Sequence, residues 1–205
     1  MLIRKINKYM SEPKVFLIRH GSTDLNGESG QSVDKIRGWI DVPLNDKGRA
    51  DAEDAKKKLK KEHPKKIYSS DLIRAHETAA IIDEDFNIPL ETSKSLRPWN
   101  LGDYQGKETS KILGELNDLI KHEDKSVKNG ESFKEFRVRY LSLMKQIVDQ
   151  AKKEHCTIFV VAHFRNLKCC DAWVENGMPN DLSIAVEYML NDKFKPGEIY
   201  EIPIK

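Results

Sequence analysis

The sequence predicts an α/β protein, built as a three-layer sandwich in which helices flank a mainly parallel central sheet. Two observations support this class. Short runs rich in Val, Ile and Phe, typical of buried parallel strands, alternate with stretches of helical periodicity. Each short run leads into a polar or charged residue. Strands and helices in this alternating order form a sheet with helices on both faces.

Three segments are predicted to be parallel strands because they are short, apolar and rich in β-branched or aromatic residues. Helices are predicted where apolar residues recur at helical spacing: over roughly 46–62, after Ser70, from Ser132 onward and after His163. The C-terminal runs VEYML and EIYEI are interpreted as a pair of strands around the turn NDKFKPG. The three parallel strands are 14–19 (KVFLIR), 65–70 (KKIYSS) and 157–162 (TIFVVA).

Two of these helices have capping signals at their first residues. Asn45 is placed to cap the helix that begins at residue 46. Ser132, followed three residues later by Glu135, forms a capping-box pattern before the apolar stripe of the long helix. These signals fix where the two helices are expected to start.

The whole-chain numbers limit the classes of partner. At 205 residues we expect 1–205 to form a single domain. The 35 Lys and Arg residues nearly balance the 33 Asp and Glu residues, which argues against a dedicated nucleic-acid or membrane surface. No apolar run approaches the length of a membrane span, and MLIRKINKYM is too polar for a secretion signal. We therefore expect a cytoplasmic protein with a small-molecule partner.

The chain contains three cysteines, Cys156, Cys169 and Cys170. An odd count with one adjacent pair fits neither a disulfide framework nor the spacing of a zinc site. We expect reduced thiols in the core. Redox chemistry at Cys169 or Cys170 is the lesser alternative.

Charged side chains and histidines lie where the three predicted strands end. Arg19 and His20 end the first strand, Arg74 follows the second at short distance, and His163 follows the third. Because parallel strands share one carboxyl edge, we expect these residues to line one pocket. One guanidinium group can donate two parallel hydrogen bonds to two oxygens of a phosphate. A histidine that neighbouring cations keep neutral acts as a nucleophile rather than as an acid. Gly21 is expected to adopt a conformation closed to other residues and to let phosphate approach the backbone.

Four segments, in order, resemble the signatures of the histidine phosphatase superfamily, also called phosphoglycerate mutase-like. The resemblance covers about residues 14 to 165. It implies one domain of this type that hydrolyses a small phosphorylated substrate to inorganic phosphate through a phosphohistidine. The segments are 19–26 (RHGSTDLN), 37–52 (RGWIDVPLNDKGRADA), 68–82 (YSSDLIRAHETAAII) and 160–164 (VVAHF).

The resemblance also implies a role for each matching residue. His20 is the nucleophile that becomes phosphorylated, Arg19 and Arg74 clamp the phosphate, and His163 is the second histidine of the pocket. Asn26 is a further phosphate or loop contact. The resemblance implies neither a metal nor a cofactor.

The chain departs from the family pattern at two positions. In the segment LRPWNLGDYQG, Pro98 stands where much of the family has the glutamate that acts as general acid. Asp103 and Glu28 are candidate replacements, although each is also explained as a solvated loop residue. Phe164 stands where a glycine usually follows the second histidine, and its ring is expected to narrow the pocket.

Three classes of function remain open on the sequence alone. The first and favoured class is an enzyme that transfers phosphoryl groups, and within it we favour a metal-independent phosphatase acting through a phosphohistidine on His20. A phosphoglycerate-mutase-type phosphotransferase is less favoured, because it needs long enclosing loops that we do not find in the sequence. A non-catalytic phosphate-binding or interaction protein on the same fold is the second class, and a structural α/β domain is the third.

Overall fold

A central sheet organises the molecule in the computed structural model, which describes residues 12–26, 33–190 and 194–204. Within these residues the sheet has five strands in the order β3-β2-β4-β1-β5. β5 pairs antiparallel with β1, and the other pairings are parallel. The strands are β1 (Lys14–Arg19), β2 (Pro64–Ser70), β3 (Leu90–Ser93), β4 (Thr157–Ala162) and β5 (Ile199–Ile202).

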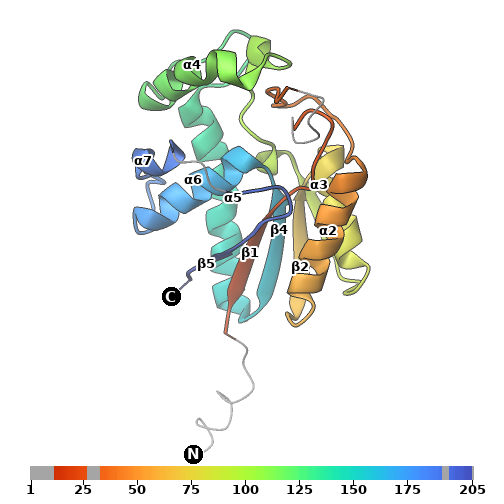
Figure 1. Cartoon of the computed structure of the whole chain (residues 1–205). Helices are drawn as coiled ribbons and strands as arrows, with labels where there is room; N and C mark the ends of the chain where they lie inside the picture. The colour runs from red at the N-terminus through yellow and green to blue at the C-terminus, as the bar shows by residue number, and fades with distance from the viewer. Residues whose placement is uncertain (1–11, 27–32, 191–193, 205) are drawn as a thin grey trace, which may run out of the picture.

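Helices cover both faces of this sheet, which confirms the expected three-layer arrangement (Figure 1). The α-helices are α2 (Asp46–Leu59), α3 (Ile73–Asp83), α4 (Thr109–Lys121), α5 (Phe133–Glu154), α6 (Phe164–Glu175) and α7 (Val186–Met189), and the 3₁₀ helices are η1 (Lys94–Leu96) and η2 (Gly102–Tyr104). α2 and α3 pack on one face, and α5 and α6 pack on the other. α4 lies beyond the carboxyl ends of the strands (Figure 1).

The alternation of side chains along β1 explains why both faces are apolar. Val15 and Leu17 point into the core under α5 and α6, whereas Phe16 and Ile18 point into the core under α2 and α3. A strand with buried side chains on both faces reads as a continuous apolar run, as this one does. β4 divides its side chains between the two cores in the same way.

The predicted helix starts are confirmed. Asn45 caps α2 by accepting a hydrogen bond from the Gly48 N–H at 2.8 Å. Ser132 and Glu135 form the predicted capping box at the start of α5. α2 ends at Leu59, earlier than the expected residue 62, because the chain must turn before Pro64 begins β2.

The interpretation of VEYML as a strand was wrong, whereas EIYEI does contain a strand, β5. Val186–Met189 is the short helix α7, which packs on α6 and buries Met189 in the core. β5 already occupies the free edge of β1, so no strand partner remains there for this run. The NDK part of the predicted turn lies outside the described residues.

Among the α-helices and strands, α4 and β3 were not named from the sequence, although α4 had a signal. α4 buries Ile112, Leu116 and Ile120, which repeat every four residues as an amphipathic helix requires. β3 has only four residues, none of them fully buried, and its short sequence LETS has no strand pattern.

The cysteines have the predicted character. Cys156, Cys169 and Cys170 are buried and form no disulfide with one another. Burial raises the pKa of Cys169 to about 12 and also raises that of Cys170, so both thiols stay protonated at neutral pH. In the part of the chain that the structure describes, no helix has both the length and the apolar character needed to cross a membrane.

The conformation expected for Gly21 was wrong, whereas the approach of phosphate to its backbone stays a prediction. Gly21 does not have a positive φ, so the left-handed conformation does not explain it. Instead, its backbone packs against Gly48 at the start of α2, where an added Cβ would lie 2.1 Å from the Gly48 carbonyl oxygen. This close approach holds the loop after β1 against the helix and helps to position His20.

Gly21→Ala is therefore expected to destabilise the protein by about 1–3 kcal/mol, the usual cost of overpacking a tight contact. Gly114→Ala in α4 is the matched control, because nothing lies within 4 Å of its Cβ position. That control should be neutral or stabilising by about 0.5–1 kcal/mol. Urea denaturation of both variants checks this, and an unchanged midpoint for Gly21→Ala would show that the contact is not tight.

Candidate active site

His20 follows β1 directly and is almost fully buried. Its Nδ1 lies 2.7 Å from the Gly21 carbonyl oxygen, which assigns the proton to Nδ1 and leaves a lone pair on Nε2. The Nε–H of Arg74 donates to that Nε2 at 3.2 Å. Burial, followed by the charges of Arg74, Arg19 and Arg37, holds the pKa of His20 well below its usual value. His20 is thus a neutral imidazole with its reactive nitrogen toward the arginine.

Arg74 lies on the first turn of α3, as expected, and is buried. Its Nη1 and Nη2 donate to the carbonyl oxygens of Ile40 and Gly38 at 2.8 and 3.0 Å. Burial lowers the pKa of Arg74 to about 9, so the group remains a cation at neutral pH. The backbone therefore holds a buried positive charge in a fixed orientation next to His20.

His163 follows β4 and is also buried. Its ring centroid lies 5.1 Å from that of His20. Neither of its ring nitrogens has a hydrogen-bond partner among the described residues, and burial, then Arg74, lowers its pKa well below the usual value. A buried polar group without a partner indicates a place where a ligand binds.

Arg19 and Asn26 do not line the cavity that contains the two histidines. Arg19 donates from Nη1 to the carbonyl oxygen of Phe194 at 2.6 Å. Asn26 accepts hydrogen bonds from the N–H and hydroxyl of Thr23 at 2.9 and 2.8 Å, so it makes the loop contact that was expected as one alternative. Both line the larger of two neighbouring cavities.

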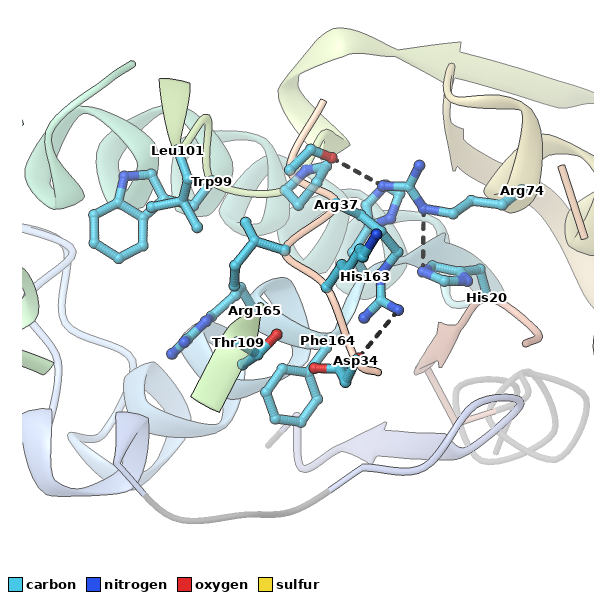
Figure 2. A pocket seen from close by; sticks show the side chains of 14 residues that line it. His20, Asp34, Arg37, Arg74, Trp99, Leu101, Thr109, His163, Phe164 and Arg165 are labelled. Atoms are coloured by element: carbon cyan, nitrogen blue, oxygen red, sulfur yellow. Dashed lines mark hydrogen bonds and ion pairs between the residues drawn. The ribbon is translucent and has the colours of Figure 1, made fainter. Parts of the chain in front are cut away.

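The smaller cavity, of about 110 Å³, contains the two histidines and Arg74 (Figure 2). Arg37, to which sequence reasoning gave no role, lines both cavities and adds a further positive charge. The larger cavity, of about 390 Å³, is lined by Arg19, Arg165 and Lys168 among others. Both cavities are therefore suited to anions.

The segment that connects η1 with η2 contributes an apolar wall to the smaller cavity. It includes Pro98, Trp99 and Leu101. The Pro98 carbonyl oxygen accepts a hydrogen bond from the Trp39 Nε1–H at 2.8 Å, which fixes this wall. At the position where the resemblance leads one to expect a glutamate, the pocket wall thus has a proline in place of an acidic side chain.

Asp103, one of the two candidate replacement acids, does not line the pocket. Asp103 is exposed in η2, accepts a hydrogen bond from the Asn129 side chain at 2.9 Å, and does not line either cavity. Glu28 lies outside the described residues. The structure instead places Asp34 at the pocket, 3.5 Å from Arg37 in an ion pair. Asp34 lies in a polar loop, and its sequence has no signal that separates it from neighbouring charges.

Phe164 begins α6 and lines both cavities, as expected for a ring that narrows the pocket. The guanidinium carbon of Arg19 and the ammonium of Lys168 each lie 5.1 Å from the centroid of this ring. Contacts of this kind are attractive because the face of an aromatic ring is electronegative. The ring thus separates the two cavities and orients cations of the larger one.

The chain is similar in sequence to known proteins. "Phosphoglycerate mutase-like protein 4" of Arabidopsis thaliana is 37% identical over 158 residues, or 73% of this chain and 66% of that protein. "Glucosyl-3-phosphoglycerate phosphatase" of Mycobacterium tuberculosis is 35% identical over 103 residues, or 50% and 44%. The matched segments therefore span less than two thirds of either relative.

Solved structures show the same fold. A mycobacterial glucosyl-3-phosphoglycerate phosphatase complexed with VO3 superimposes with a TM-score of 0.73 at 24% identity, covering 92% of both chains. A putative α-ribazole-5'-phosphate phosphatase from Escherichia coli gives 0.71 at 22% identity and covers 92% of this chain and 89% of that one. The model of the histidine phosphatase superfamily, branch 1, matches residues 15–187. This chain belongs to the histidine phosphatase superfamily.

Proposed function

We propose that this protein is a phosphatase that hydrolyses a small phosphorylated substrate through a phosphohistidine on Nε2 of His20. The observation that carries the proposal is the neutral His20, whose Nε2 lone pair lies beside a buried cation and a second histidine with unpartnered nitrogens. A nucleophile and an anion-binding site in one small cavity are the requirements for phosphoryl transfer.

In the first step, the hydrogen bond from the Nε–H of Arg74 passes from His20 Nε2 to a phosphoryl oxygen, and the Nε2 lone pair so released attacks phosphorus in line with the leaving group. The N–P bond forms, and the P–O bond to the leaving group breaks with its electron pair on oxygen. Arg74 and Arg37 balance the charge of the phosphoryl oxygens, and the one N–H of neutral His163 donates to one of them. The Gly21 carbonyl stabilises the positive charge that develops on the His20 ring.

In the second step, water attacks the phosphohistidine, the N–P bond breaks, and inorganic phosphate leaves. The guanidinium groups supply the positive charge that both steps require, so the reaction can proceed through this chain's own residues without a metal. The mutase-type alternative differs only at this point, because the phosphoryl group would then pass to a second substrate rather than to water. A non-catalytic phosphate-binding protein is the alternative that Pro98 favours.

His20→Ala is expected to reduce turnover of p-nitrophenyl phosphate to background, since the nucleophile is removed. His163→Ala should lower kcat by about 10²- to 10³-fold, the usual cost of one donor to a developing anion. His76→Ala, an exposed histidine of α3, is the matched control and should leave turnover unchanged. A folded His20→Ala protein with wild-type activity would contradict the mechanism, and a wild type that binds phosphate without turnover would support the binding protein.

Arg74→Lys tests the fixed orientation of the buried cation. Lysine retains the charge, but it cannot donate to Ile40, Gly38 and His20 from one planar group. Loss of one such charged hydrogen bond costs about 1.5–3 kcal/mol, so phosphate should bind at least about 10-fold more weakly. Calorimetry measures this, with Arg49→Lys at an exposed ion pair as the control. An unchanged dissociation constant would remove Arg74 from the phosphate site.

The apolar wall at Pro98 predicts a steep dependence of rate on the leaving group. No acid at that wall protonates the departing oxygen, so aryl phosphates should react far faster than alkyl phosphates. A series of phosphomonoesters with leaving groups of different pKa gives the slope. Asp103→Asn should leave that slope unchanged because Asp103 is directed to Asn129. A shallow slope in the wild type that becomes steep in Asp103→Asn would show that Asp103 reaches the pocket after all.

A further inference from the structure

The hydrolysis step requires a proton acceptor that the two histidines do not provide. Water must lose a proton as it attacks phosphorus, and His20 is itself the leaving group in this step. His163 is a weak proton acceptor, because burial and the neighbouring arginines hold its pKa well below the usual value. Arginine side chains accept no proton. A carboxylate at the cavity would supply the acceptor that this step needs.

Asp34 is the one carboxylate among the described residues that line the two cavities. It lies where the larger cavity meets the small one that contains His20 and His163, since it lines both. A carboxylate oxygen is a hydrogen-bond acceptor and can act as a general base. Oδ1 of Asp34 lies 3.5 Å from Nη1 of Arg37 in an ion pair.

The backbone fixes Asp34 at this position. Its carbonyl oxygen accepts a hydrogen bond from the N–H of Thr109, the first residue of α4, at 2.9 Å. The next residue, Lys35, donates to Leu25 at 3.1 Å and forms an isolated bridge with Glu108. The segment is thus tied both to the loop after His20 and to the helix over the site.

Arg37 connects Asp34 with the reaction centre. It lines both cavities, and its charge contributes to the lowered pKa of both histidines, so it lies close to them. Figure 2 shows the ion pair of Asp34 and Arg37 on the side of the pocket where Thr109 and Phe164 lie. A phosphoryl group held by Arg37 would be within reach of a water molecule bound to Asp34. The Asp34 side chain is 44% exposed, so bulk solvent can remove the proton afterwards.

We propose that Asp34 is the general base that activates water for hydrolysis of the phosphohistidine. As the water oxygen bonds to phosphorus, one water proton passes to the Asp34 carboxylate and the other stays on the oxygen. The N–P bond breaks with its electron pair returning to Nε2 of His20, and hydrogen phosphate is released. This inference rests on the proposed function, because it requires the phosphohistidine to form.

Rapid-quench kinetics with p-nitrophenyl phosphate separate the two steps. Asp34→Asn should release close to one p-nitrophenol per site in a fast burst, because attack by His20 is intact. The following steady-state rate should fall by about 10²- to 10⁴-fold, the usual contribution of a general base. Phosphohistidine should accumulate in this variant. Asp103→Asn, which removes an exposed carboxylate outside the cavities, is the matched control and should behave as the wild type.

A second variant separates a chemical role from a structural one. In Asp34→Ala, added formate should restore part of the steady-state rate and lower the amount of phosphohistidine, since a small carboxylate replaces the missing acceptor. Circular dichroism checks the fold of both variants. A merely structural contribution from the ion pair with Arg37 would not respond to formate.

Three outcomes would overturn the inference. Asp34→Asn with a wild-type steady-state rate would show that Asp34 accepts no proton in the slow step. A folded Asp34→Asn protein that loses the burst itself would place Asp34 in the first step, as a donor. If the wild type forms product without any phosphohistidine, the proposed function fails together with this inference, and that result is distinct from the other two.

Discussion

The parallel pairing of β1 with β4 is the constraint on which the site depends. Arg19 lies opposite Ala162 in the register, and the His20 N–H donates to the Ala162 carbonyl oxygen at 3.0 Å. A histidine follows the last residue of each strand, His20 after β1 and His163 after β4. Because the two strand ends are paired, the centroids of the two rings lie 5.1 Å apart. A shift of this register would move one histidine away from the pocket edge and turn neighbouring core residues to the wrong face.

The electrostatics of the site follow from this placement. The two imidazoles and the guanidinium of Arg74 are buried together. Protonation of either histidine would be costly here, because the new charge would be removed from water and would be repelled by the guanidinium. Both histidines remain neutral for that reason, and the Gly21 carbonyl selects the tautomer with an unprotonated Nε2, which accepts the hydrogen bond from Arg74. The burial that lowers the pKa of His20 therefore also keeps Nε2 unprotonated, as a nucleophile requires. An incoming phosphate dianion would supply the negative charge that the buried guanidinium lacks.

Sequence reasoning succeeded where local pattern and topology act together. The capping box was sufficient to predict where α5 begins. The apolar runs of β1 and β4, together with the common edge of parallel strands, were sufficient to predict that His20, Arg74 and His163 line one pocket. It failed where a tertiary contact decides the outcome. Val186–Met189 is helical because it packs on α6, and Gly21 is explained by its contact with Gly48. Asp34 and, next to Arg37, Ile36 form backbone hydrogen bonds with Thr109 and Lys107, residues far along the chain, and no local pattern reports such bonds.

The most direct test of the account is detection of the covalent intermediate itself. Wild-type protein is mixed with p-nitrophenyl phosphate, quenched within milliseconds into alkaline denaturant, in which phosphohistidine is stable, digested and analysed by peptide mass mapping. The account predicts a phosphoryl group on the peptide that contains His20, located on that residue by fragmentation. Turnover with no phosphorylated His20 at any quench time, or a phosphoryl group on His163 instead, would contradict it.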